Sequence, residues 1–241
     1  MRSQSSLQDL ARQIVSAMSA PETIARATRA MEMTRSLGLH SDWDPCVEKV
    51  IDFGSLIEAA ARVLPSGGSI ETGVYRGGTS GPLIVCASPD TFHLSIDPFG
   101  LPSQSYSELA GDYGAWSEVR KTLARLAGLG QEQSVTYCHY LMASAEFIRA
   151  DLLSLHQSSF RIVHLDGAHD KEGVVDELAY FRRRLPGPSL FILDDHDANF
   201  PGVGEAVNSP AGVGLVPVVH RFYKFPGLVE ACAFSAWLHG S

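Results

Sequence analysis

Between residues 65 and 199, short apolar runs alternate with stretches of helical spacing. The apolar runs predict strands at 69–72, 92–96, 134–138, 161–165 and 189–193. The stretches between them predict helices at 77–87, 115–128, 143–156 and 170–184. This alternation is typical of βαβ units, whose right-handed crossovers place helices on both faces of a parallel sheet. The chain is therefore predicted to be α/β, with a Rossmann-like, doubly wound sheet.

The segments on either side of this region differ from it in texture. After residue 199 a short helix precedes two β-rich runs, 214–224 and 229–237, and the short gap between them favours a hairpin. The sheet should thus have seven strands, mostly parallel, and end in an antiparallel pair.

Helical spacing dominates the first 64 residues, which we interpret as an N-terminal helical cap before an α/β domain at 65–241. Two helices are predicted at 7–19 and 22–37, and a third at about 45–64, with Asp44 as its N-cap and Pro45 in its first position. The first two helices precede the first strand, so they should lie outside the sheet core. They would either cover the domain or form a contact in a homo-oligomer.

Charge and composition exclude several classes of protein. The net charge of −8 opposes unaided binding to nucleic acid or to an anionic membrane, which requires clustered Lys and Arg. No run approaches the roughly 18 apolar residues of a membrane helix, and no signal-peptide core follows the start. We therefore expect a cytoplasmic protein. Its four widely spaced cysteines should be free thiols or small core residues.

A glycine-rich turn, Glu71-Thr-Gly-Val-Tyr-Arg-Gly-Gly, follows the first predicted strand. Gly73 and Gly77 allow close approach of the backbone to a ligand, but their spacing differs from the G-x-G-x-x-G of dinucleotide-binding folds. Glu71 suits a ligand with a cationic amine. Asp97 ends the second strand, where a ribose-binding acid is expected. A nucleoside with an amino-acid tail and no phosphate satisfies both features.

These residues resemble the first motif of the class I S-adenosylmethionine-dependent methyltransferases, and are especially similar to that of the macrocin-type sugar O-methyltransferases of antibiotic biosynthesis. The resemblance implies that residues 65–241 form a domain that binds S-adenosylmethionine. It implies that Glu71, Gly73 and Gly77 face this cofactor and that Asp97 holds its ribose. Ser144, just after the third strand, falls where such enzymes contact the adenine.

Acidic residues end the fourth and fifth predicted strands, in Asp166-Gly-Ala-His169 and in Asp194-Asp195. These strands should be neighbours, so three carboxylates would meet at one edge of the sheet. Like charges so placed repel unless a cation joins them. Carboxylate oxygens suit Mg²⁺, and they tolerate Mn²⁺ as well. The sequence therefore predicts a metal site of Asp166, Asp194 and Asp195.

The resemblance extends to this region, because macrocin-type and related enzymes carry a metal-binding Asp after strand four and an Asp pair after strand five. Many members also have a second Asp, taken as the base, where this chain has Ala168. His169 matches instead the Asp-x-x-His pattern of the mycinamicin-type branch, whose His is the proposed base. His169 is thus the predicted catalytic base, with His164 and His196 as rivals.

The predicted function is metal-assisted O-methylation of a small molecule, with a sugar of a natural product as the leading acceptor. A catechol, phenol or nitrogen acceptor remains an alternative, as does a non-catalytic nucleoside-binding protein of the same fold. The loop from Pro98 to Trp116, with its Ser, Gly, Pro and aromatic residues, is interpreted as either a substrate lid or a surface loop.

Overall fold

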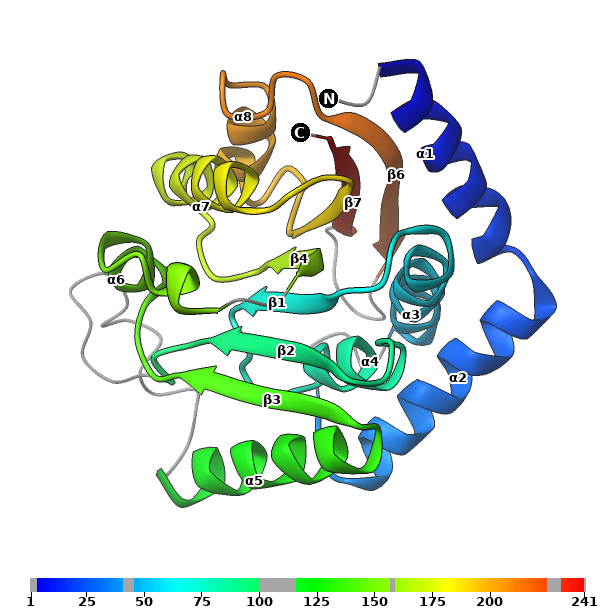
Figure 1. The fold of residues 1–241 in the computed structure, drawn as a ribbon, viewed down its shortest axis with the longest axis vertical. Helices are drawn as coiled ribbons and strands as arrows, with labels where there is room; N and C mark the ends of the chain where they lie inside the picture. The colour runs from blue at the N-terminus through cyan, green and yellow to red at the C-terminus, as the bar shows by residue number, and fades with distance from the viewer. Residues whose placement is uncertain (1–3, 41–45, 100–115, 157–158, 225–230, 241) are drawn as a thin grey trace.

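The computed structural model describes residues 4–40, 46–99, 116–156, 159–224 and 231–240. Seven strands form one sheet in the order β3-β2-β1-β4-β5-β7-β6 (Figure 1). Their bounds are β1 Gly68–Thr72, β2 Thr91–Ile96, β3 Val135–Tyr140, β4 Phe160–Leu165, β5 Ser189–Asp194, β6 Val216–Lys224 and β7 Ala231–His239. Strands β1 to β5 are parallel, and β7 runs antiparallel between β5 and β6. The predicted fold class is confirmed, including the C-terminal antiparallel pair.

Helices cover both faces of this sheet. They are α1 Gln4–Met18, α2 Pro21–Ser36, α3 Val47–Val63, α4 Ser80–Val85, α5 Trp116–Glu132, α6 Ser144–Arg149, α7 Lys171–Arg184 and α8 Pro201–Val207, with a 3₁₀ turn at Leu152–Leu155. Figure 1 shows α1, α2 and α3 along one side of the molecule and α6, α7 and α8 on the other.

Several helices differ from their predicted bounds. The single helix predicted at 143–156 ends at Arg149, because Asp151 takes a left-handed conformation with φ of 51° that an α-helix cannot continue through. The third N-terminal helix begins at Val47 with Cys46 in the N-cap position. Asp44 and Pro45, which were predicted to begin it, lie outside the described residues.

Each face of the sheet carries its own apolar core. On one face, side chains of α1 and α3 such as Ile14 and Leu56 share a buried cluster with Ile192 of β5 and Phe234 of β7. On the other face, α6, α7 and α8 pack against the remaining strand side chains, including Val163 of β4. Helices α1 and α3 therefore share the core of the sheet, which corrects the expectation that the first helix lies outside it, whereas α2 packs against α3 and α4.

A row of buried polar side chains crosses the α3 face of the parallel strands. Glu71 is in register with Ser95 of β2 and with His164 of β4, so the three side chains lie on one face. The hydroxyl of Ser95 lies 2.8 Å from Nδ1 of His139, and Nδ1 of His164 lies 3.1 Å from Oε1 of Glu71. Buried polar groups need such partners, since an unpaired one is costly.

The described residues also bear on membrane and redox behaviour. None of their helices has both the length and the apolar character that a bilayer crossing requires. Cys46 and Cys86 are buried, Cys138 is half-buried, and all three are free thiols, as predicted. The side chain of Cys232 lies outside the described residues.

Candidate active site

The strand order reverses between β1 and β4: β2 and β3 follow on the far side of β1, whereas β5 lies on the far side of β4. Open α/β sheets bind ligands at such a switch point, at the carboxyl ends of the strands. Here the glycine turn that follows β1 meets the loop that follows β4. The backbone N–H of Asp166 donates to the carbonyl oxygen of Thr72 at 3.0 Å. The two predicted motifs therefore lie side by side.

Both predicted glycines have backbone conformations that favour glycine. Gly73 has φ of 79°, and a Cβ there would overlap the carbonyl oxygen of Asp166. Gly77 has φ of 80°, and its Cβ would lie 3.0 Å from Cδ2 of Leu39. Gly73 thus permits the approach of the turn to the β4 loop, whereas Gly77 permits its packing against the segment after α2.

Asp97 joins the end of β2 to the glycine turn. Its Oδ2 accepts hydrogen bonds from the backbone N–H groups of Val74 at 2.6 Å and Tyr75 at 2.9 Å, and its Oδ1 accepts one from Phe99 at 2.6 Å. Burial raises the pKa of Asp97, while these three donors oppose the shift. The predicted ribose-binding acid is thereby held in one orientation at the ligand edge.

Glu71 is fully buried, and the protein itself supplies its hydrogen-bond donors. Its carboxylate accepts from the hydroxyls of Thr79 and Ser80 and lies 3.1 Å from Nδ1 of His164. Burial alone would raise the pKa of Glu71, but hydrogen bonds and charge from His164 and His93 outweigh it and lower the pKa to about 2. Glu71 is therefore an ionised anchor beneath the turn.

Asp166 and His169 follow β4, Asp194 ends β5, and Asp195 follows it. Together these four residues form the acidic cluster of the site. Nε2 of His169 lies 3.5 Å from Oδ1 of Asp166 and 3.3 Å from Oδ2 of Asp195, without hydrogen-bond alignment to either. These three side chains are partly exposed, at 25% for Asp166, 29% for His169 and 21% for Asp195. The N-cap of α7 is Asp170, so Asp166 is not used to cap that helix.

Charge repulsion shapes the protonation of the acidic cluster. Burial and the charge of Asp194 raise the pKa of Asp166 to about 6. Burial and the charges of Asp194 and Asp166 raise the pKa of Asp195 to about 8. Burial would lower the pKa of His169, but its interactions with Asp166 and Asp195 outweigh this and raise the pKa to about 9. The three groups titrate as one coupled set.

Asp194 is buried, unlike its neighbours, and belongs to a different contact. Its Oδ1 lies 2.9 Å from Nζ of Lys49, which comes from α3. Potential ligand atoms lie within 4.8 Å of one another in two groups, one of His164, Asp166 and Asp194 and one of Asp166, His169 and Asp195. Asp166 is common to both groups. The predicted metal ligands thus lie at one edge of the sheet, but Asp194 contacts Lys49, whereas Asp166 and Asp195 contact His169.

Lys49 and Glu177 are two buried charged residues that the sequence analysis missed. Both carry a detectable signal, because each lies on an apolar helix face: Lys49 shares its face with Phe53 of α3, and Glu177 shares its face with Val174 and Phe181 of α7. A charged residue on the apolar stripe of a helix is an exception that a helical projection would reveal.

The carboxyl group of Glu177 lies beneath the acidic cluster, against Gly167, and neither oxygen accepts a well-aligned hydrogen bond. Burial raises the pKa of Glu177 to about 7, and the nearby hydroxyls of Ser144 and Thr72 oppose the shift. Ser144, predicted to contact adenine, is half-buried at the first position of α6, with Ala143 as the N-cap.

The rival histidines lie in other surroundings. His164 is buried within β4 and bound to Glu71, as its strand position predicts. Nδ1 of His196 lies 2.7 Å from the hydroxyl of Ser235, and its ring stacks on His220 with 4.4 Å between centroids. Burial lowers the pKa of His196 to about 4. Of the three, His169 is the histidine that contacts both Asp166 and Asp195.

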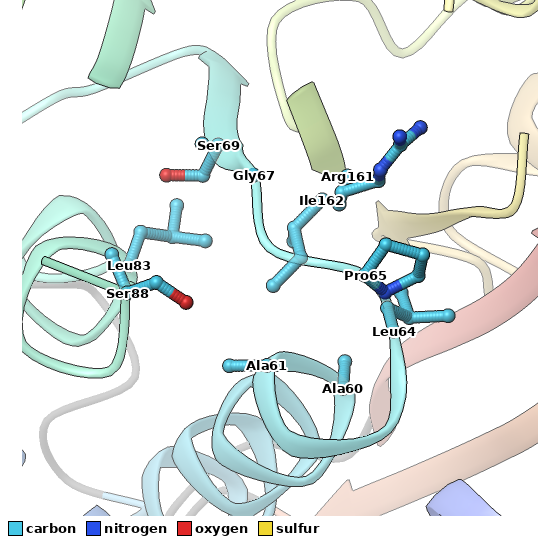
Figure 2. Close-up of a pocket in the computed structure, with 12 residues that line it drawn as sticks. Ala60, Ala61, Leu64, Pro65, Gly67, Ser69, Leu83, Ser88, Arg161 and Ile162 are labelled. Carbon is cyan, nitrogen blue, oxygen red and sulfur yellow. The ribbon is translucent and has the colours of Figure 1, made fainter. Parts of the chain in front are cut away.

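A pocket between the end of α3 and the start of β1, lined by Leu64, Pro65 and Arg161 among others, encloses about 10 Å³ (Figure 2). This volume is far below the roughly 300 Å³ of a small ligand pocket, and the pocket lies at the amino end of β1. The predicted lid at 98–116 lies mostly outside the described residues.

Comparison with known proteins places the fold. No family model and no curated protein sequence matches the chain. Among solved structures, the O-methyltransferase TomG of tomaymycin synthesis from Streptomyces achromogenes, in complex with S-adenosylmethionine, is similar with a TM-score of 0.57 and 16% identity, over 90% of each chain. An O-methyltransferase from Bacillus cereus in complex with S-adenosylhomocysteine is similar with a TM-score of 0.53 and 13% identity, over 89% of this chain and 90% of that one.

The calicheamicin methyltransferase CalS11 is also similar, with a TM-score of 0.50 and 15% identity, over 90% of this chain and 93% of its own. The strand order, the antiparallel end of the sheet and these likenesses show a Rossmann-like fold similar to that of these methyltransferase structures.

Proposed function

We propose that this chain is an S-adenosylmethionine-dependent O-methyltransferase that acts on a hydroxyl of a small molecule. One observation carries the proposal: the glycine turn with Asp97 and the acidic cluster with His169 meet at the switch point of the sheet. The first supplies a cradle for a nucleoside without phosphate, and the second supplies a proton acceptor beside it.

The acceptor class is proposed as a sugar of a natural product. The sugar rests on the motifs quoted above, and the natural product on two solved structures whose names link them to tomaymycin synthesis and to calicheamicin. The acidic balance of the chain agrees with a small acceptor rather than a nucleic acid.

In the proposed reaction, S-adenosylmethionine supplies an electrophilic methyl group on a sulfonium. A C–O bond forms to the acceptor hydroxyl as the C–S bond breaks, giving a methyl ether and S-adenosylhomocysteine. His169 takes up the hydroxyl proton, and Asp166 and Asp195 orient its ring and stabilise the imidazolium that results. The Phe200 ring, 4.6 Å from that of His169 between centroids, limits its movement.

A divalent cation, Mg²⁺ or Mn²⁺, is part of the proposal. Hard cations prefer oxygen ligands, and the predicted ligands Asp166, Asp194 and Asp195 would hold one. Ligand atoms of Asp166 lie within 4.8 Å of those of Asp194 in one group and of those of Asp195 in another. Such an ion lowers the pKa of a bound hydroxyl. It would also lower the pKa of His169, which the two carboxylates hold protonated to about 9.

The test is calorimetric titration of the purified protein with S-adenosylmethionine, with and without Mg²⁺, followed by a screen of sugar and phenol acceptors for release of S-adenosylhomocysteine. We expect binding, loss of binding in Asp97→Ala, and turnover that EDTA abolishes and Mg²⁺ restores. Circular dichroism checks that the variant is folded. Absence of binding under both conditions contradicts the proposal, and full turnover after chelation contradicts its metal component alone.

A further inference from the structure

A lysine from the N-terminal helices lies inside the acidic cluster. Lys49 belongs to the first turn of α3, is 0% exposed, and places Nζ 2.9 Å from Oδ1 of Asp194, a residue 145 positions further along the chain. Lysine is almost never fully buried unless it is paired, because removing its charge from water is costly. The ion pair with Asp194 is therefore what allows Lys49 to be buried at the site.

The packing of α3 fixes the position of this lysine. Phe53 lies one turn after Lys49, so both side chains project from the same face of the helix. The ring of Phe53 packs on that of His164 in β4, with 5.0 Å between centroids, and on that of Phe234 in β7. Helix α3 is thus held against β4 and β7, which flank β5, and it delivers an ammonium group to the acidic carboxyl end of β5.

Basic side chains of the protein already contact all three carboxylates of the predicted metal site. Lys49 contacts Asp194, and Nε2 of His169 lies between Asp166 and Asp195. An ammonium group and a divalent ion cannot share one buried carboxylate without strong mutual repulsion. A metal ion that uses Asp194 must therefore compete with Lys49.

We propose that Lys49 is an internal cation of the acidic cluster, which holds Asp194 in an ion pair and limits the affinity of the site for a divalent metal. The inference rests on the metal component of the proposed function. It makes α3 part of the site, with Lys49 as a positioning residue that acts through Asp194. A divalent ion would then depend mainly on Asp166 and Asp195.

The experiment measures Mn²⁺ affinity by electron paramagnetic resonance of the free ion, in the wild type and in Lys49→Met, Lys49→Arg, Asp194→Asn and the double variant Lys49→Met/Asp194→Asn. We expect Lys49→Met to bind Mn²⁺ at least about tenfold more tightly, because Asp194 is released to the metal and a like charge is removed. Lys49→Arg, which keeps the charge, should bind as the wild type does. The double variant should lose the gain.

Asp194→Asn provides a second, independent comparison with the wild type. If Lys49 holds Asp194, this change should weaken Mn²⁺ binding by less than about threefold. A loss of about thirtyfold or more would mean that Asp194 is already a metal ligand, and it would overturn the inference even if Lys49→Met does not fold. Unchanged or weaker binding in a folded Lys49→Met overturns it as well.

S-adenosylmethionine binding, measured on the same samples, separates this inference from the proposed function. If Lys49→Met does not tighten Mn²⁺ binding while cofactor binding is intact, the role of Lys49 is removed and the methyltransferase proposal stands. The expected Mn²⁺ results without any cofactor binding support the role of Lys49 in a metal site of other function.

Discussion

The carboxylates at the ends of β1 and β2 contrast with those at the ends of β4 and β5. Glu71 and Asp97 are buried, and each accepts several hydrogen bonds from nearby hydroxyl, imidazole or backbone groups. Asp166 and Asp195 are partly exposed and lie on either side of one imidazole. The carboxylates of the first pair have donors arranged by the protein before any ligand arrives. The carboxylates of the second pair remain able to interact with a cation or with a bound ligand.

The difference is visible in the protonation of Glu71 and Asp195. Donors lower the pKa of Glu71 to about 2 despite its burial, whereas burial and mutual repulsion raise the pKa of Asp195 to about 8. Strongly raised values of this kind are typical of functional sites, where stability is sacrificed for chemistry. The following variants test whether the two regions divide stability and function in this way.

The largest effect is expected at His169. Replacement by alanine removes the proposed proton acceptor, so kcat should fall by about 10²–10⁴-fold, the usual contribution of a general base. The Kd for S-adenosylmethionine should stay within about threefold of the wild-type value, because the glycine turn and Asp97 are untouched. Release of S-adenosylhomocysteine, with an acceptor identified by screening, measures the turnover. His196→Ala is the matched control and should keep most of the activity; near-normal turnover in His169→Ala would remove His169 from the role.

The largest effect on stability is expected at Glu71. Glu71→Leu removes the acceptor for His164 and two hydroxyls, so the free energy of unfolding should fall by about 3–5 kcal/mol, as when one partner of a buried ion pair is deleted. Because the folded pKa of Glu71 lies below its usual value, its stabilisation is present above about pH 4.5 and is lost as the pH falls through about 2. Urea denaturation at pH 7 measures the effect.

The control for Glu71 is Glu118→Leu, which alters an exposed pair with Lys121 on α5. It should leave the urea midpoint unchanged, because exposed pairs contribute little. Equal stability of the Glu71 and Glu118 variants would mean that the buried polar row is not the anchor described above.

Much of this architecture could be predicted from the sequence. Alternation of apolar runs and helical spacing gave the sheet, its helices and the C-terminal pair, and two motifs at strand ends pointed to one edge of the sheet. Those signals are local or periodic, so they survive without knowledge of tertiary packing. The parallel topology is sufficient to bring together the residues at the ends of β1, β2, β4 and β5.

The rest depended on contacts between distant segments. The sequence placed Glu71 toward a ligand, but Thr79, Ser80 and His164 surround its carboxylate. It also grouped Asp194 with Asp195, because adjacent letters do not reveal that one side chain turns toward a lysine in α3. Successive side chains along a strand point to opposite faces, so Asp194 and Asp195 enter different contacts. Such pairings are set by the packed structure.

Glu177 extends the comparison to the interior beneath the acidic cluster. Its folded pKa of about 7 lies above its usual value. The protonated carboxyl therefore contributes its full stability below about pH 4.5, and this contribution is lost as the pH rises through 7. Glu177→Gln keeps the shape without the charge. It should raise the free energy of unfolding at pH 8 by up to about 3 kcal/mol and leave it nearly unchanged at pH 4.5. Urea denaturation across this range measures the difference, and a parallel offset at every pH would contradict the titration of this group.

The smallest effect, and the sharpest test of the contrast, is expected at Asp195. Its carboxylate repels Asp194 and Asp166, and asparagine adopts its left-handed backbone more readily than most residues do. Asp195→Asn should therefore stabilise the fold by about 1 kcal/mol at pH 8, while the same change at Asp97 should destabilise it by about 1–3 kcal/mol, since an amide accepts fewer of the three backbone N–H bonds. Opposite signs from one chemical substitution would show that the ends of β1 and β2 are organised for stability and those of β4 and β5 for chemistry. Equal destabilisation at both positions would mean that Asp195 is as fully satisfied as Asp97, and the acidic cluster would then lose its claim to be the reactive half of the site.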